Sequence, residues 1–266
     1  MTTPRLLHFC RFGLLALPLV LPLPAFAASD TPVCSTVTSQ PPIRLPKAAD
    51  KLAKTGSLTI VALGSSSTAG VGASSPSRTY PARLEAELSA RFPGATITVV
   101  NRGVNGEDAP ENVRRMERDV ASTRPDVVLW QVGTNALLRQ FGVTGSDGPM
   151  RAGIAQIRSF GAEPVLIDPQ YAPWVVVDPD AKPMVKLIAD LGREQNVPVF
   201  NRFAMMQTWH ERDKISFPQM SFIDGLHGND FAYDCLARSL AYSLAMGLKP
   251  STAQPAVASS GAPPAR

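Results

Sequence analysis

Short apolar runs alternate with longer segments of helical periodicity along most of the chain. The apolar runs are rich in β-branched residues, as in strands buried on both faces of a sheet, and they lie at 58–63, 96–100, 126–132, 164–167 and 197–200. The other segments repeat apolar residues every three or four positions, as on the inner side of a helix, and they lie at 80–92, 111–123, 148–160, 179–195 and 229–246. This alternation predicts an α/β fold, a single domain in which helices cover both faces of a mainly parallel five-stranded sheet.

The start of the chain has the composition of a secretory signal peptide. Residues 1–27 contain Arg5 and Arg11, then an apolar run interrupted by prolines, and they end in Ala-Phe-Ala. A basic start, an apolar middle and a small-x-small end are typical of a cleaved signal. An uncleaved anchor is the alternative, but the run is short and broken for a membrane span. We therefore expect a periplasmic or secreted protein with no membrane span after cleavage.

Two further segments lack the periodicity of a folded domain. Residues 28–56 are expected to form an extended N-terminal lead-in, and residues 250–266, mostly Pro, Ala, Ser and Gly, a disordered tail. The domain itself is predicted to span 57–249, which is long enough for one well-buried core.

The charge and the cysteines limit the possible partners. The formal net charge is +4 over the whole chain, and removal of the two signal-peptide arginines leaves about +2, so nothing favours nucleic acid as a partner. Cys34 and Cys235 are the only cysteines after residue 27, and in an oxidising compartment we expect them to form a disulfide. Two unpaired thiols are the alternative. We expect a monomer.

Small polar residues follow the predicted strands, where parallel sheets place their chemistry. The first such loop contains Ser66, the second spans 101–106 with two glycines, and the third contains Asn135. A fourth loop contains Asp224 and His227. Together they offer a hydroxyl, flexible backbone, a carboxamide, a carboxylate and an imidazole, which is the set of groups that acyl transfer requires. Taken alone, the first loop is equally a Ser-rich turn.

The two histidines after residue 27 differ in their surroundings. Asp224 precedes His227 by three residues with Gly225 between them, so a tight turn can bring the carboxylate to the ring and fix its tautomer. The alternative for His227 is a local hydrogen bond at the start of a helix. His210 follows an apolar helical segment, so it is structural or lines a pocket.

The four loops, in this order, resemble the sequence blocks of the SGNH hydrolases, the GDSL-type esterase/lipase superfamily. The family's Gly-Asp-Ser-x-Thr corresponds to Gly64-Ser65-Ser66-Ser67-Thr68, and its second block ends at Gly106. Its Gly-x-Asn-Asp corresponds to residues 133–136 and its Asp-x-x-His to residues 224–227. The resemblance covers 58–246 and implies a three-layer, flavodoxin-like α/β/α sandwich without a cofactor.

The resemblance also implies roles for individual residues. Ser66 is the expected nucleophile, His227 the base and Asp224 the group that orients it. The backbone N–H groups of Ser66 and Gly106 and the side chain of Asn135 are the expected oxyanion donors.

Two positions depart from the family pattern. Ser65 and Ala136 stand where the family usually has Asp, which we expect to affect loop stiffness and substrate range more than activity. Other templates fit less well, because Thr68 occupies the last position of a Gly-x-Ser-x-Gly elbow and no Lys-Ser/Thr follows the glycines. No His, Cys or Asp cluster has the spacing of a metal site.

These observations predict a serine hydrolase that cleaves acyl or acetyl esters of small molecules, glycans or lipids. The aromatic residues Tyr171 and Trp174, with His210, are expected to line the substrate pocket. Two alternatives remain at this point: a non-catalytic or weakly catalytic glycan-binding protein of the cell envelope, and an acyltransferase or thioesterase that uses the same site.

Overall fold

The computed structural model describes residues 32–139 and 142–249. The predicted signal peptide and the predicted C-terminal tail lie outside the described residues.

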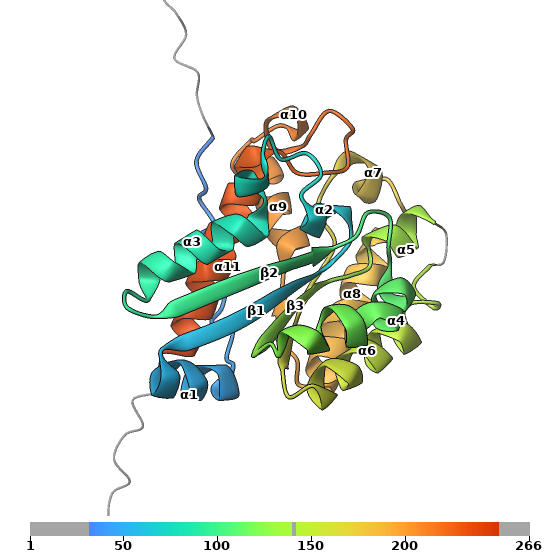
Figure 1. Ribbon diagram of the computed structural model, residues 1–266. Helices are drawn as coiled ribbons and strands as arrows, with labels where there is room; N and C mark the ends of the chain where they lie inside the picture. Colours follow the sequence, from blue (N-terminus) through green and yellow to red (C-terminus); the bar gives the residue numbers. More distant parts are fainter. Residues whose placement is uncertain (1–31, 140–141, 250–266) are drawn as a thin grey trace, which may run out of the picture. The chain divides into compact units, whose positions relative to one another are not determined.

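The sheet has five strands, and every neighbouring pair is parallel. The strands are β1 (Ser57–Gly64), β2 (Thr96–Gly103), β3 (Val127–Gln131), β4 (Glu163–Ile167) and β5 (Val199–Phe200), in the spatial order β2-β1-β3-β4-β5. The chain leaves β1 toward β2 and then returns to its other side with β3 (Figure 1). The carboxyl ends of β1 and β3 therefore flank a topological switch point, where ligands bind in open α/β sheets.

Helices cover both faces of the sheet, which confirms the predicted three-layer α/β/α fold (Figure 1). One face packs against α1 (Pro46–Thr55), α3 (Tyr80–Arg91), α9 (Arg202–Glu211) and α11 (Asp230–Leu248). The other packs against α4 (Ala109–Asp119), α6 (Asp147–Ser159) and α8 (Ala181–Glu194). Side chains of β1 alternate between the two cores, with Ile60 in the first and Val61 in the second. None of the helices described here is long and apolar enough to cross a membrane.

Shorter elements connect the layers. One-turn helices α2 (Ser66–Ala69), α7 (Pro173–Val176) and α10 (Phe217–Met220) and the slightly longer α5 (Thr134–Leu138) lie in the loops, with 3₁₀ turns at Pro76–Arg78 and Ala121–Thr123. Figure 1 shows α2 and α5 at the carboxyl ends of the central strands.

The expectation of an extended lead-in over 28–56 is wrong for its last part, which forms helix α1. Pro46 occupies the first turn, where its missing N–H costs nothing, and Gly56 ends the helix in the left-handed conformation with φ 63°. Ala48 and Leu52, four residues apart, are buried against the first core. Two apolar positions in a short segment gave too weak a periodicity to predict the helix.

The segment before α1 is linked to α11 by a disulfide and a backbone hydrogen bond. Cys34 and Cys235 form a disulfide with a Cα–Cα distance of 5.4 Å, and the N–H of Ile43 donates to the carbonyl of Ser243 at 3.0 Å. The disulfide closes a loop of 201 residues, so it constrains most of the domain.

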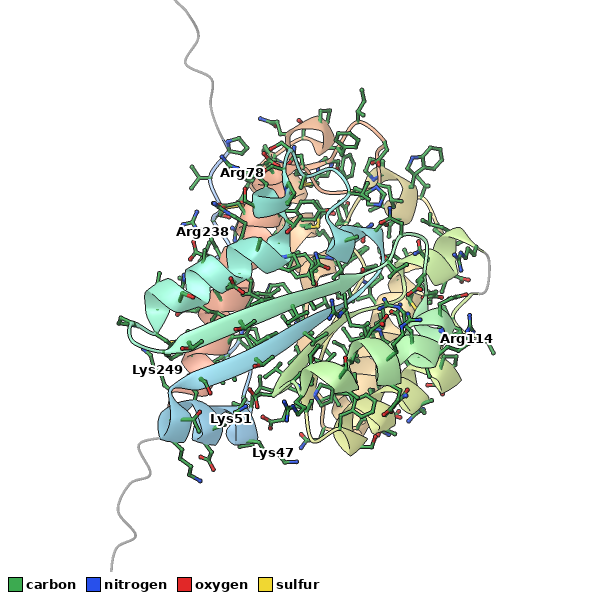
Figure 2. The ribbon with its side chains drawn as sticks, viewed as in Figure 1. Lys47, Lys51, Arg78, Arg114, Arg238 and Lys249 are labelled. Atoms are coloured by element: carbon green, nitrogen blue, oxygen red, sulfur yellow. A yellow bond between two sulfur atoms is a disulfide. The ribbon has the colours of Figure 1, made fainter. Side chains whose placement is uncertain are left out.

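The positive charges are spread over separate elements. Figure 2 labels Lys47 on α1, Arg78 before α3, Arg114 on α4 and Arg238 on α11, and in this view they do not gather into one basic patch.

Candidate active site

Burial separates the four hydroxyl groups that follow β1. Ser65, Ser67 and Thr68 are buried, whereas Ser66 is partly exposed. Ser66 is the first residue of α2, and its backbone N–H lies in the first turn, where helix donors lack intrahelical acceptors. The turn is tight, because a Cβ added to Gly64 would lie 2.5 Å from the Thr68 hydroxyl oxygen. Ser66 is therefore the hydroxyl presented to a ligand.

His227 and Asp224 lie beside Ser66, although 161 residues separate His227 from Ser66 in the chain. The Nε2 of His227 is 2.7 Å from the Ser66 Oγ, and its Nδ1 is 2.6 Å from the Asp224 Oδ2. Because a carboxylate only accepts, Nδ1 carries the hydrogen and Nε2 is free to accept the Ser66 proton. Gly225, with φ 69°, makes the turn that brings Asp224 back to the ring.

Asp224 is held in its ionised form. Partial burial raises the pKa of its carboxyl group, but hydrogen bonds from the His227 ring and from the backbone N–H groups of His227 and Leu226 lower it more. The net pKa lies below the usual value of 3.8. The two backbone bonds, at 2.9 Å and 3.0 Å, go to Oδ1 and leave Oδ2 for the ring.

The predicted oxyanion residues lie in the loops after β2 and β3. Gly106 has φ 78°, a conformation that favours glycine, and its carbonyl accepts a hydrogen bond from Arg139. Asn135 lies in α5 and donates through Nδ2 to the carbonyl of Glu107 at 2.6 Å. An amide nitrogen has two hydrogens, so this bond orients the side chain and leaves a second donor for a ligand.

A buried charge network lies beneath the loop that contains Gly106. The Glu107 carboxylate accepts from Arg115 Nε at 2.5 Å and from Asn112 Nδ2 at 2.8 Å. Arg115 also donates to the carbonyls of Arg102 and Gly64, at 2.8 Å and 3.2 Å. Because Gly64 precedes the Ser66 turn, this single guanidinium connects the ends of β1 and β2. Sequence reasoning missed Glu107, Asn112 and Arg115.

The structure explains the two departures from the family pattern in physical terms. The backbone N–H and the hydroxyl of Ser65 both donate to Gln131 Oε1, at 3.1 Å and 3.0 Å, and Thr68 donates to the same oxygen at 3.3 Å. Side-chain hydrogen bonds thus hold the turn without an Asp at position 65. Ala136 is fully buried in the second core, where a carboxylate would be costly.

The three predicted pocket residues separate into two groups. Trp174, in α7, is 60% exposed and donates through Nε1 to the Asp224 carbonyl at 2.9 Å, so it contacts the loop that contains Asp224 and His227. Tyr171 and His210 pack against Phe217, with ring centroids 5.8 Å and 4.2 Å away. His210 Nδ1 also lies 3.0 Å from the carbonyl of Ile215. The structure therefore places Tyr171 and His210 in an aromatic cluster, in which the two rings pack against Phe217 and lie beside each other.

The described residues contain no group of three or more His, Cys, Asp or Glu side chains arranged to hold a metal ion. The hydrogen-bonded set of Ser66, His227 and Asp224 can move a proton from a hydroxyl to an imidazole without further groups.

This architecture is the SGNH (GDSL-type) hydrolase fold, as the sequence blocks predict. The chain belongs to the non-GDSL lipase-like family, whose model matches residues 31–250. No curated protein matches the chain by sequence.

Solved structures of this fold are similar to the chain at low sequence identity. A lipase/acylhydrolase from Enterococcus faecalis is 24% identical with a TM-score of 0.61, covering 74% of this chain and 100% of that one. Axe2, an acetylxylan esterase from Geobacillus stearothermophilus, is 21% identical with a TM-score of 0.59, covering 73% and 97%. A two-domain esterase active on acetylated mannans is 20% identical with a TM-score of 0.64, covering 78% and 55%. At these identities the likeness establishes the fold.

Proposed function

We propose that this protein is a periplasmic or secreted serine esterase that hydrolyses acyl esters at Ser66. One observation carries the proposal: His227 bridges Ser66 and Asp224 through hydrogen bonds of 2.7 Å and 2.6 Å. A nucleophile, a base within reach of it and an acid that orients the base are the requirements of the serine-hydrolase mechanism, whichever fold presents them. Family membership and the fold of known esterases agree with this chemistry.

The reaction proceeds through an acyl-enzyme. Ser66 Oγ attacks the ester carbonyl carbon while His227 Nε2 takes its proton, and Asp224 stabilises the imidazolium that forms. The negative oxygen is held by the N–H groups of Ser66 and Gly106 and by Asn135. The C–O bond to the alcohol then breaks, and His227 returns the proton to the departing oxygen. Water repeats these steps on the acyl-enzyme, which releases the acid and restores Ser66.

The surroundings of the triad fit a substrate with an apolar part. A cavity of about 370 Å³ lies against the loop that contains Asp224, and its lining is mostly apolar: Pro173, Phe217, Pro218, Ser221, Phe222, Ile223 and Gly225. The exposed ring of Trp174, in α7, is hydrogen-bonded to the same loop, and an aromatic face can receive a sugar ring or an acyl chain. We propose small acyl esters, with acetylated glycans as the first substrates to test, because two fold relatives are named for acetylated polysaccharides.

A serine-reactive fluorophosphonate probe tests the proposal. We expect the probe to label the wild-type protein and the Ser77→Ala variant, in which an exposed serine away from the triad is removed. The Ser66→Ala variant should not be labelled. Absence of wild-type labelling, together with no release of acetate from acetylated xylan or aryl acetate, would contradict the esterase and favour the glycan-binding alternative.

A further inference from the structure

One buried amide connects the two halves of the candidate site. Gln170 lies just beyond the end of β4 and is 3% exposed. Its Nε2 donates to the carbonyl of Leu226 at 3.2 Å, and its Oε1 accepts from the Thr134 hydroxyl at 3.0 Å. Leu226 directly precedes His227, and Thr134 directly precedes Asn135.

The orientation of this amide is fixed by a charged neighbour. The guanidinium of Arg202, which is 2% exposed, donates through Nη2 to Gln170 Oε1. A guanidinium has no acceptor atom, so the Gln170 oxygen must face Arg202 and the NH₂ group must face Leu226. Gln170 therefore cannot rotate its amide without leaving a buried cation against another donor.

Arg202 is itself held by two groups of Asp168. Its Nε donates to the Asp168 carbonyl at 3.1 Å, and the Asp168 carboxylate lies close enough to interact with its charge. Asp168 is 1% exposed, and its Oδ1 accepts from the backbone N–H of Phe203 at 2.9 Å, at the start of α9. A buried guanidinium tolerates little displacement, because each lost hydrogen bond leaves part of its charge uncompensated. Arg202 and Asp168 thus form a rigid base for Gln170.

We propose that Gln170 is a positioning residue, which sets the location of His227 relative to Asn135 through its bonds to Leu226 and Thr134. The inference rests on the proposed esterase function, because it holds that the hydrogen bonds of Gln170 align the base with the oxyanion donor. Acyl transfer is sensitive to such alignment, since a displacement of about 1 Å can cost about a hundredfold in rate.

Two substitutions separate positioning from a contribution to stability alone. Gln170→Met keeps the length of the side chain and removes all three hydrogen bonds. Gln170→Glu keeps acceptors for Arg202 and Thr134, and Arg202 holds the new carboxylate ionised, so it has no hydrogen for the Leu226 carbonyl. If Gln170 serves only to satisfy Arg202, Glu restores both stability and activity. If it positions the His227 loop, Glu restores stability alone.

The experiment measures kcat per active site, with active sites counted by fluorophosphonate labelling, KM for an aryl acetate and the thermal midpoint. Gln207→Met is the matched control. Gln207 lies on the same helix as Arg202, but its side chain donates an exposed hydrogen bond to Glu211. We expect Gln170→Met and Gln170→Glu each to lower kcat per labelled site by about ten- to a hundredfold, with KM within about twofold of wild type. Gln170→Glu should be closer to wild type than Gln170→Met in thermal midpoint, and Gln207→Met should match wild type throughout.

Wild-type kcat per labelled site in Gln170→Glu would overturn the positioning role, and that variant carries the test if Gln170→Met does not fold. A wild-type protein that neither hydrolyses aryl acetate nor reacts with the probe would overturn the esterase proposal and this inference with it. The two failures are therefore distinguishable by the wild-type measurement.

Discussion

Ser66, His227 and Asp224 hold one another directly, whereas Gly106 and Asn135 are held by groups outside the proposed chemistry. Each member of the triad has a hydrogen bond of 2.6 Å or 2.7 Å to another member. Asn135 instead donates to a backbone carbonyl of Glu107, and the loop of Gly106 rests on Arg115 and Arg139. The oxyanion half of the site thus depends directly on residues that take no part in the proposed chemistry.

The difference has a consequence for mutations. A change to the triad should remove the chemistry and leave the fold, because its members are partly exposed and bond mainly among themselves. A change beneath the oxyanion loop should lower stability and activity together, because the same charges support both. The predictions below test this division, beginning with the largest effect.

Ser66→Ala should lower kcat for an aryl acetate by at least about 10⁴-fold, because the nucleophile is lost while the oxyanion donors remain. The thermal midpoint should stay within a degree or two of wild type, since the Ser66 side chain is partly exposed. Steady-state kinetics and thermal unfolding of the same preparation check both statements. A variant with substantial turnover would remove Ser66 from the mechanism.

Asn135→Ala should lower kcat by about 10²- to 10³-fold, the usual cost of losing one oxyanion donor. Its bond to the Glu107 carbonyl is also lost, so we expect a decrease of about 1 kcal/mol in the free energy of unfolding. KM should change little, because the donor acts mainly on the transition state. An unchanged kcat would exclude Asn135 from the oxyanion hole.

Glu107→Gln should lower kcat by about tenfold and the free energy of unfolding by about 2 kcal/mol, because the buried Arg115 loses a charged partner while an acceptor oxygen is retained. Urea unfolding and kinetics measure the two losses. Glu117→Gln, on the exposed side of helix α4, which also contains Arg115, is the matched control and should change neither. A loss of stability with full activity would show that the network does not reach the oxyanion donors.

The last prediction concerns stability alone, through its dependence on pH. Burial raises the pKa of Asp168 to about 7, although the hydrogen bond from the Phe203 N–H and the charge of Arg202 both lower it. Between the ordinary carboxyl pKa of 3.8 and this value, the native state binds more protons than the unfolded state, so stability should fall as pH rises. One proton gives a slope of at most about 1.4 kcal/mol per pH unit.

Asp168→Asn should remove this part of the slope, measured as the free energy of unfolding at pH 5, 6, 7 and 8. The exposed substitution Asp50→Asn should leave it in place. An identical slope in Asp168→Asn and wild type would show that this carboxyl group does not titrate in that range.

The fold was predictable because its five strands are short apolar runs and its helices have clear periodicity. Ser66, Asp224 and His227 were predictable as a set because each lies in a recognisable sequence block, although their catalytic roles stay predictions. Helix α1 was missed because only Ala48 and Leu52 mark its buried side.

The supporting residues could not be found in the sequence. Gln170 and Leu226 are 56 residues apart, and only the fold brings them together. Tyr171 and His210 show a different limit, since the sequence offers their rings as candidates for a pocket but does not reveal which way each ring faces.

Trapping of the acyl-enzyme tests whether Ser66 is the nucleophile. The protein is mixed with an excess of p-nitrophenyl acetate, quenched in acid during the first turnovers and mapped by peptide mass spectrometry. We expect an acetyl group on Ser66 and none on Ser65, Ser67 or Thr68. An acetyl group on another residue, or ester hydrolysis with no acetyl-enzyme in wild type or in Asn135→Ala, would contradict this expectation.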